Sequence, residues 1–383
     1  MADTTEHFFA SCPRGLESAL ADELRELEVS DPATTDGGVA FCGAFELCYR
    51  VNLRSRIASR LLWRVHATAY RNEDEVYRAA HALPWPSWFD VGRSIAVSVN
   101  ARRAPLKSLD FITLRIKDAV CDRFRAERGS RPSVDTRAPE VRVFAFFDQS
   151  NVIFYLDTSG DALFRRGARV KAGEAPLKEN LAAGILRLSG WRPGTPLLDP
   201  MCGGGTFLTE AAQIALNIAP GLGRKFGFEQ LRRFDAGHWL RLRQAAESTR
   251  LAAQPLAIFG SDRYGAALDI ARANAAACGL PDVVQFKQAN VLEVRRPAEH
   301  GIWLANPPYG ERIGEQQELA ALYPRLGDKL KKDFAGWNAF FFTADRRIEK
   351  LIGLRASRRT PLFNGPLECR LFEFRMVAGS ARA

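Results

Sequence analysis

The sequence lacks the patterns of a membrane protein, a secreted protein or a metal-binding protein. No apolar run approaches the roughly 18 residues that a bilayer span needs, and the acidic opening residues do not form a secretory signal. The seven cysteines include no CxxC pair, and the five histidines form no HxxxH pattern. We therefore expect a cytoplasmic protein with reduced thiols, no metal site and no membrane partner.

The composition is that of an ordinary globular protein, but its charge is unevenly spread. The 383 residues are 46% hydrophobic and 26% charged, and the length suits two or three domains. The net charge is +10, yet residues 1–49 carry 2 basic and 10 acidic side chains, whereas residues 50–175 carry 23 and 14. A basic middle and end suit a polyanionic partner such as nucleic acid, although arginine-rich surfaces also occur without one.

The first 160 residues mix helical and strand patterns. Leucines at helical spacing follow a short strand near the start, and a helical pattern runs from Phe45 to about Leu62. Residues 111–128 form an amphipathic helix with a basic face, and residues 142–147 and 152–157 alternate like the strands of a hairpin. These patterns predict an α+β region.

From residue 176 onward, short apolar runs alternate with helical segments. The runs lie at residues 197–198, 256–259, 301–305 and 339–343. This alternation predicts a doubly wound, mostly parallel sheet. Residues 161–175 read as a linker with a basic strand, and residues 217–255 as an insertion after the first helix of this region.

A glycine-rich turn follows the first of these buried strands. The strand ends at Asp199, and Gly203, Gly204 and Gly205 precede a helix that begins near Phe207. Glycines let the backbone approach a ligand closely. The turn is neither a Walker loop nor a spaced GxGxxG, and an acidic residue ahead of it suits a ligand with an ammonium group. A glycine-rich turn in another kind of α/β protein is the alternative.

Two polar residues end the next two strands. Asp262 stands where a carboxylate accepts both hydroxyls of a ribose, and it is also a candidate N-cap for a helix over residues 266–278. Asn290 ends the following strand, where it either contacts an adenine edge or is an ordinary loop residue.

The Asn306-Pro307-Pro308-Tyr309 turn is the most informative segment. The two prolines make a rigid corner after a buried strand. The Asn306 side-chain carbonyl and the Pro307 backbone carbonyl can both accept hydrogen bonds from an amino group, and Tyr309 offers a face on which a base can stack. Such a corner would orient the nitrogen and offset its positive charge as it attacks a methyl group.

At these residues the chain resembles the THUMP-domain RNA methyltransferases, especially the bacterial 23S rRNA guanine-N2 methyltransferases. Residues 8–17, 131–137, 156–167, 175–182 and 310–314 resemble further segments of that family. Asn290 departs from it, because the family usually has Asp there.

The resemblance implies three parts and a cofactor. It implies a ferredoxin-like unit over residues 1–55, a THUMP RNA-binding domain over 56–160, a linker over 161–175 and a Rossmann-like class I methyltransferase domain with a seven-stranded, mostly parallel sheet over 176–383. S-adenosylmethionine is the implied cofactor. Its expected contacts are Leu177, Lys178, Asp199, Pro200, Cys202, Gly203, Gly204, Gly205, Thr206, Asp262, Arg263, Asn290, Val291 and Asn306.

The expected substrate is RNA. Asn306, Pro307, Pro308 and Tyr309 are the expected contacts of the target base. The cations expected to bind RNA are Arg102, Arg103, Lys107, Arg115, Arg123, Arg125, Arg131, Arg165, Arg166 and Arg312. The leading hypothesis is methylation of guanine N2 in 23S rRNA, and a tRNA guanine-N2 enzyme is second. A non-catalytic RNA-binding or ribosome assembly protein is the alternative of another class.

Overall fold

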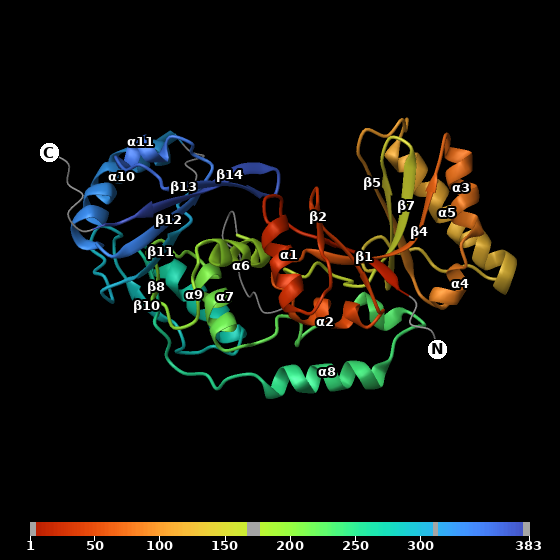
Figure 1. Ribbon diagram of the computed structural model, residues 1–383, viewed down its shortest axis with the longest axis horizontal. Helices are drawn as coiled ribbons and strands as arrows, with labels where there is room; N and C mark the ends of the chain where they lie inside the picture. The colour runs from red at the N-terminus through yellow and green to blue at the C-terminus, as the bar shows by residue number, and fades with distance from the viewer. Residues whose placement is uncertain (1–4, 167–176, 309–312, 378–383) are drawn as a thin grey trace. The chain divides into compact units, whose positions relative to one another are not determined.

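The chain folds into two compact units, each built around one seven-stranded sheet (Figure 1). The computed structural model describes residues 5–166, 177–308 and 313–377. Within those ranges, no helix is long and apolar enough to cross a bilayer. Unit 1 consists of Met1–Cys12, Ala21–Leu163 and Gly221–Ala245, and unit 2 of Pro13–Leu20, Phe164–Pro220 and Ala246–Ala383.

The sheet of unit 1 contains strands from both of the parts expected before residue 160, which are residues 1–55 and 56–160. Its strands are β1 (Glu6–Ser11), β2 (Ala33–Thr35), β3 (Gly38–Gly43), β4 (Arg60–Ala69), β5 (Ile95–Ala101), β6 (Val141–Phe147) and β7 (Asn151–Asp157). They lie in the order β2-β3-β1-β4-β7-β6-β5. The central strand β4 pairs antiparallel with β1 on one side and β7 on the other. The first 55 residues and the next hundred therefore share one sheet.

Most helices of unit 1 follow the apolar periodicity of the sequence. They include α2 (Leu47–Arg54), α3 (Glu73–Ala82), α4 (Trp85–Trp88) and α5 (Leu109–Arg128). Helix α1 (Glu17–Glu26) begins in unit 2 and ends in unit 1. The Ser108 side chain accepts the N–H of Phe111 to begin α5, and Gly129, at φ +70°, ends it. The helix expected from Phe45 to Leu62 is wrong in its second half, because α2 ends at Arg54 and β4 begins at Arg60.

The segment that was expected as an insertion folds partly with unit 1. It contains a short 3₁₀ helix, η1 (Gly227–Gln230), and α8 (Ala236–Ser248). The N–H of Gly221 donates to the Leu53 carbonyl at 2.9 Å, and the ring of Phe228 lies 4.6 Å from that of Tyr49. Residues 221–245 thus complete the core of unit 1, although the chain on both sides of them belongs to unit 2.

The sheet of unit 2 confirms the expected seven-stranded, mostly parallel architecture. Its strands are β8 (Leu197–Asp199), β9 (Ile258–Asp262), β10 (Gln285–Gln288), β11 (Gly301–Ala305), β12 (Trp337–Thr343), β13 (Arg358–Asn364) and β14 (Leu367–Arg375). The order is β10-β9-β8-β11-β12-β14-β13; the first five strands are parallel, and β14 pairs antiparallel with both β12 and β13, so it is the one reversed strand of this sheet. All five residues of β11 are buried, as expected for a central strand covered on both faces.

Helices cover both faces of this second sheet. They are α6 (Glu179–Leu188), α7 (Thr206–Ala215), α9 (Gly265–Ala277), α10 (Ile313–Asp333) and α11 (Ile348–Ile352). One face of the sheet packs its Trp303 and Leu198 side chains in a core with Leu326 of α10 and Ile348 of α11. On the other face, α7 packs against both α6 and α9 (Figure 1).

Candidate cofactor and base-binding site

The ends of three adjacent strands place polar residues at one edge of the unit 2 sheet. Strand β8 pairs in parallel with β9 on one side and with β11 on the other. The residues at or just after their carboxyl ends are Asp199, Asp262 and Asn306. A doubly wound sheet binds its ligands at this edge, where the strand order reverses. The chain order of the strands reverses at β8, so this edge is the candidate site.

The glycine turn after β8 has the conformation that only glycine adopts easily. Gly203 has φ +50° and Gly205 has φ +74°. A Cβ added at Gly205 would lie 3.1 Å from the Cβ of Ala271, whereas one at Gly203 would meet nothing within 4 Å. Gly205 therefore allows α7 and α9 to pack, while Gly203 leaves open space at the candidate site. Cys202 and Pro200 of this turn are buried, and Thr206 begins α7.

The Asp262 carboxylate holds two backbone segments at the site. Its Oδ2 accepts the N–H of Gly203 at 3.0 Å, and its Oδ1 accepts the N–H of Tyr264 at 3.0 Å. Tyr264 is the N-cap residue of α9, so the alternative that Asp262 is the helix N-cap is not what the structure shows. The neighbouring Arg263 is exposed, and its guanidinium lies 4.5 Å from the centre of the Tyr264 ring.

Asp199 is a buried carboxyl whose protonation depends on what faces it. It is 2% exposed, and its Oδ1 accepts the N–H of Met201 at 3.2 Å. Burial raises the pKa of Asp199 to about 8; the Met201 hydrogen bond opposes this rise, and the Asp262 carboxylate adds to it. A cationic ligand group facing Asp199 would stabilise the ionised form.

The segment after β10 places fewer polar side chains at the candidate site than the ends of β8, β9 and β11 do. Asn290 is exposed, and its Oδ1 accepts the N–H of Leu292 at 3.0 Å, while Val291 is buried. The Asn290 side chain therefore closes a local turn.

The remaining expected contacts lie on α6 and after β11. Leu177 is buried and Lys178 is the N-cap residue of α6, with its ammonium 5.0 Å from the centre of the Phe164 ring. After β11, Asn306 is half-buried, Pro307 buried and Pro308 exposed. Tyr309 and Arg312 lie outside the described residues.

Seven of the cations expected to bind RNA are gathered on and around α5 in unit 1. Arg102, Arg103 and Lys107 occupy the loop before it, and Arg131 follows it. On the helix, Arg115 pairs with Asp74 at 2.8 Å, Arg123 with Glu127 at 3.2 Å and Arg125 with Asp122 at 2.7 Å. Ion pairs at or near the surface contribute little stability.

Arg165 and Arg166 differ in what surrounds them. Arg165 is exposed, whereas the Arg166 side chain is 6% exposed and forms an ion pair with the buried Glu210. Sequence reasoning missed Glu210 and also Asn274, whose Nδ2 donates to the Gly204 carbonyl at 3.0 Å. The sequence did contain a signal for Glu210: the polar residues of α7, which are Thr206, Thr209, Glu210 and Gln213, recur at helical spacing. Across the described ranges, no three His, Cys, Asp or Glu side chains cluster as metal ligands would.

Comparison with known families divides the chain into three matching segments. Residues 166–373 match the family described as RMKL-like, methyltransferase domain. Residues 70–157 match the THUMP domain, and residues 7–62 match the RlmL ferredoxin-like domain.

Full-length similarity extends to named relatives. The chain is 40% identical, over 97% of its length, to the ribosomal RNA large subunit methyltransferase K/L of Syntrophotalea carbinolica, of which it covers 54%. The chain thus spans about half the length of such curated relatives. It is 37% identical to slr0064 of Synechocystis sp., whose name describes an RNA methyltransferase, and covers 97% of it.

Solved structures share the fold over nearly the whole chain. SMU.472, a methyltransferase crystallised with S-adenosylhomocysteine, has a TM-score of 0.88 and 31% identity, with 99% of each chain covered. A protein from Clostridium difficile 630 has a TM-score of 0.90 and 28% identity, covering 99% of this chain and all of its own.

Proposed function

The chain belongs to the family of RMKL-like methyltransferases, and from this premise we propose that it transfers the methyl group of S-adenosylmethionine to the exocyclic N2 of a guanine in 23S rRNA. The proposal draws on the names of its large-subunit rRNA methyltransferase relatives and on the residues at the sheet edge. We further propose that the basic surface around α5 captures the RNA.

One observation carries the proposal: Asp199 and Asp262 end β8 and β9, Asn306 follows β11, and these three neighbouring parallel strands end at the same edge of the sheet. The donor set fits the cofactor, because a buried carboxyl suits its ammonium and a strand-end carboxylate suits its ribose. The open space at Gly203 leaves room for the ligand close to the backbone. S-adenosylmethionine supplies an activated methyl group on a sulfonium.

The corner after β11 supports the choice of an amino nitrogen as acceptor. Asn306 and Pro307 follow the fully buried strand β11, and both prolines lack a backbone N–H. Their part of the site therefore presents acceptors, which suit the two N–H donors of a guanine amino group. Accepting those hydrogen bonds orients the nitrogen and stabilises positive charge that develops on it during transfer. The product ammonium is acidic enough to lose its proton without a dedicated base.

The test is transfer of tritium from labelled S-adenosylmethionine to separate samples of 23S rRNA, tRNA, DNA and protein. We expect label in 23S rRNA. Asn306→Ala should abolish transfer while RNA binding, measured by filter retention, stays within about twofold of wild type. Asn338→Ala is the matched control, because Asn338 lies at the other end of the same sheet, paired with Ile302 of β11.

Three outcomes would contradict the proposal. Label confined to tRNA would show that the substrate is tRNA and not rRNA. Label confined to DNA or protein would show that the substrate is not RNA. Full activity of Asn306→Ala would remove the role of the corner.

A further inference from the structure

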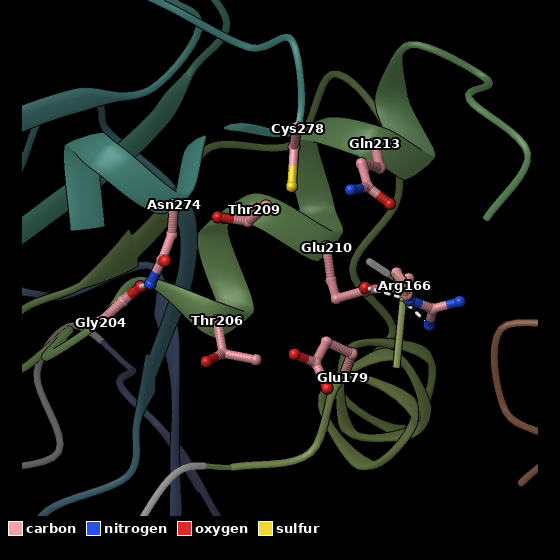
Figure 2. A pocket seen from close by; sticks show the side chains of 9 residues that line it. All are labelled: Arg166, Glu179, Gly204, Thr206, Thr209, Glu210, Gln213, Asn274 and Cys278. Atoms are coloured by element: carbon pink, nitrogen blue, oxygen red, sulfur yellow. Dashed lines mark hydrogen bonds and ion pairs between the residues drawn. The ribbon is translucent and has the colours of Figure 1, made fainter. Parts of the chain in front are cut away.

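Helix α7 has a polar face where a buried helix normally packs apolar side chains. Thr206, Thr209, Glu210 and Gln213 recur at helical spacing on one side of it. They line a small cavity of about 40 Å³ between α6, α7 and α9 (Figure 2). The other lining residues are Arg166, Glu179, Gly204, Asn274 and Cys278. Apolar packing therefore does not fix α7 on this side.

The strongest contact in the cavity is a buried ion pair between Arg166 and Glu210. The Arg166 Nε lies 2.7 Å from Glu210 Oε1, and its Nη2 donates to Oε2 at 3.1 Å. The two side chains are 6% and 2% exposed. Figure 2 shows the Glu210 carboxylate pointing at the guanidinium. Two guanidinium nitrogens therefore lie against the two carboxylate oxygens, and the Nη2 hydrogen bond gives the contact a direction.

The Gln213 side chain also hydrogen-bonds the Cys278 thiol, a contact between neutral groups that is weaker than the ion pair. Thr209 Oγ1 and Gln213 Oε1 are buried and have no hydrogen-bond partner among the described residues. The cavity is large enough for a water molecule, which could satisfy such atoms. A water adapts to small movements of its neighbours, so it would not set the position of α7 as a two-point ion pair does.

Any shift of α7 would reach the cofactor turn directly. Gly205 is the N-cap residue of this helix, and Glu210 lies just over one turn further along it. On the α9 side, the Asn274 amide already holds the Gly204 carbonyl at 3.0 Å. The turn is thus held from α9 by Asn274 and, through the rigid helix, by the Arg166–Glu210 pair.

We propose that Arg166 is a positioning residue: through Glu210 it sets the position of α7 and thereby of the Gly203–Gly205 turn that binds the cofactor. This assigns Arg166 to cofactor binding instead of to RNA contact. The inference rests on the proposed use of S-adenosylmethionine.

The test measures S-adenosylhomocysteine affinity by calorimetry for wild type, Arg166→Met and the double variant Arg166→Met/Glu210→Met. We expect Arg166→Met to weaken binding about tenfold or more, because a misplaced binding element loses affinity steeply. RNA affinity and its salt dependence should stay at wild-type values. Arg359→Met is the matched control, since Arg359 pairs with Glu349 in the same unit but on the surface, and its affinity should be unchanged.

The double variant separates positioning from loss of folding. It removes the unpaired buried carboxylate, so its melting temperature should recover relative to Arg166→Met. Its S-adenosylhomocysteine affinity should remain weak, because two methionines cannot fix direction. Arg166→Lys should recover part of the affinity.

Wild-type affinity in the folded double variant would overturn the inference, and so would an altered RNA salt slope with unchanged cofactor affinity in Arg166→Met. A wild-type protein that does not bind S-adenosylhomocysteine would instead contradict the proposed function itself.

Discussion

Gly203 donates its backbone N–H to Oδ2 of Asp262 at 3.0 Å, although 59 residues separate them. The contact joins the glycine turn after β8 to the end of β9. Asp262 therefore has a structural role that does not depend on a ligand: the carboxylate that suits a ribose also holds the glycine turn in place.

Asp262→Asn should weaken S-adenosylhomocysteine binding by about ten- to a hundredfold, because hydrogen bonds to a charged group contribute about 1.5–3 kcal/mol. The Gly203 and Tyr264 N–H groups approach different carboxylate oxygens, and an amide replaces one of these oxygens by an NH₂ group, so it cannot accept both. Calorimetric titration measures the loss. Asp269→Asn, on the surface of α9 beside Arg272, is the control and should bind normally. Equal affinities for all three proteins would refute the role of Asp262.

Because the pKa of Asp199 is raised in the folded protein, the free energy of unfolding should fall as the pH rises. Burial raises its pKa to about 8 in the folded protein, against about 3.9 in an unfolded chain. Between these values the folded state holds a proton that the unfolded state has lost, so raising the pH through this window destabilises the fold. The melting temperature of wild type should drop from about pH 5 to about pH 8, relative to that of Asp199→Asn, and level off above that range. Parallel curves would contradict this prediction.

The two left-handed glycines should respond differently to alanine. Both substitutions carry the backbone cost of about 1 kcal/mol for an L-residue at positive φ. Gly205→Ala also forces its Cβ to 3.1 Å from that of Ala271, so its melting temperature should fall further. Gly203→Ala meets open space, so its main effect should be weaker S-adenosylhomocysteine binding. Thermal melts and titrations of both variants check the contrast, which a reversed order would contradict.

Arg125 should contribute to RNA binding through charge alone. Removing one phosphate contact lowers the slope of log affinity against log salt by about one, and Arg125→Ala should do so. Arg25→Ala provides a close match, because Arg25 pairs with Asp22 at 2.6 Å with the same three-residue spacing, and is equally exposed. Arg25 lies in the acidic first segment, so its removal should leave the slope unchanged. Equal slopes for both variants would indicate that RNA binds to a surface other than that around α5.

The sequence predicted the strand ends of unit 2 because their signal is local. Asp199, Asp262 and Asn306 each follow a short apolar run. Such a run is the usual sequence pattern of a parallel strand that is buried on both faces. The boundary between α2 and β4 was missed because Ile57, Ala58, Leu61 and Leu62 are all buried, which suits a helix or a strand equally well.

Contacts between distant segments were not predictable in the same way. Arg166 looked like a surface cation beside Arg165, and nothing in its neighbourhood points to Glu210, 44 residues later. The aromatic residues of 221–245 lack a regular period, so their packing on Tyr49 has no signature in the sequence. Both features depend on how the chain folds back on itself.

We propose above that the corner at Asn306 and Pro307 orients a guanine amino group for methylation. The most direct test of this proposal is mass spectrometry of nucleosides from 23S rRNA treated with the protein and S-adenosylmethionine carrying a deuterated methyl group. We expect deuterated N2-methylguanosine with wild type and none with Asn306→Ala. A deuterated methyl on a ring nitrogen, a carbon or a ribose oxygen would contradict it.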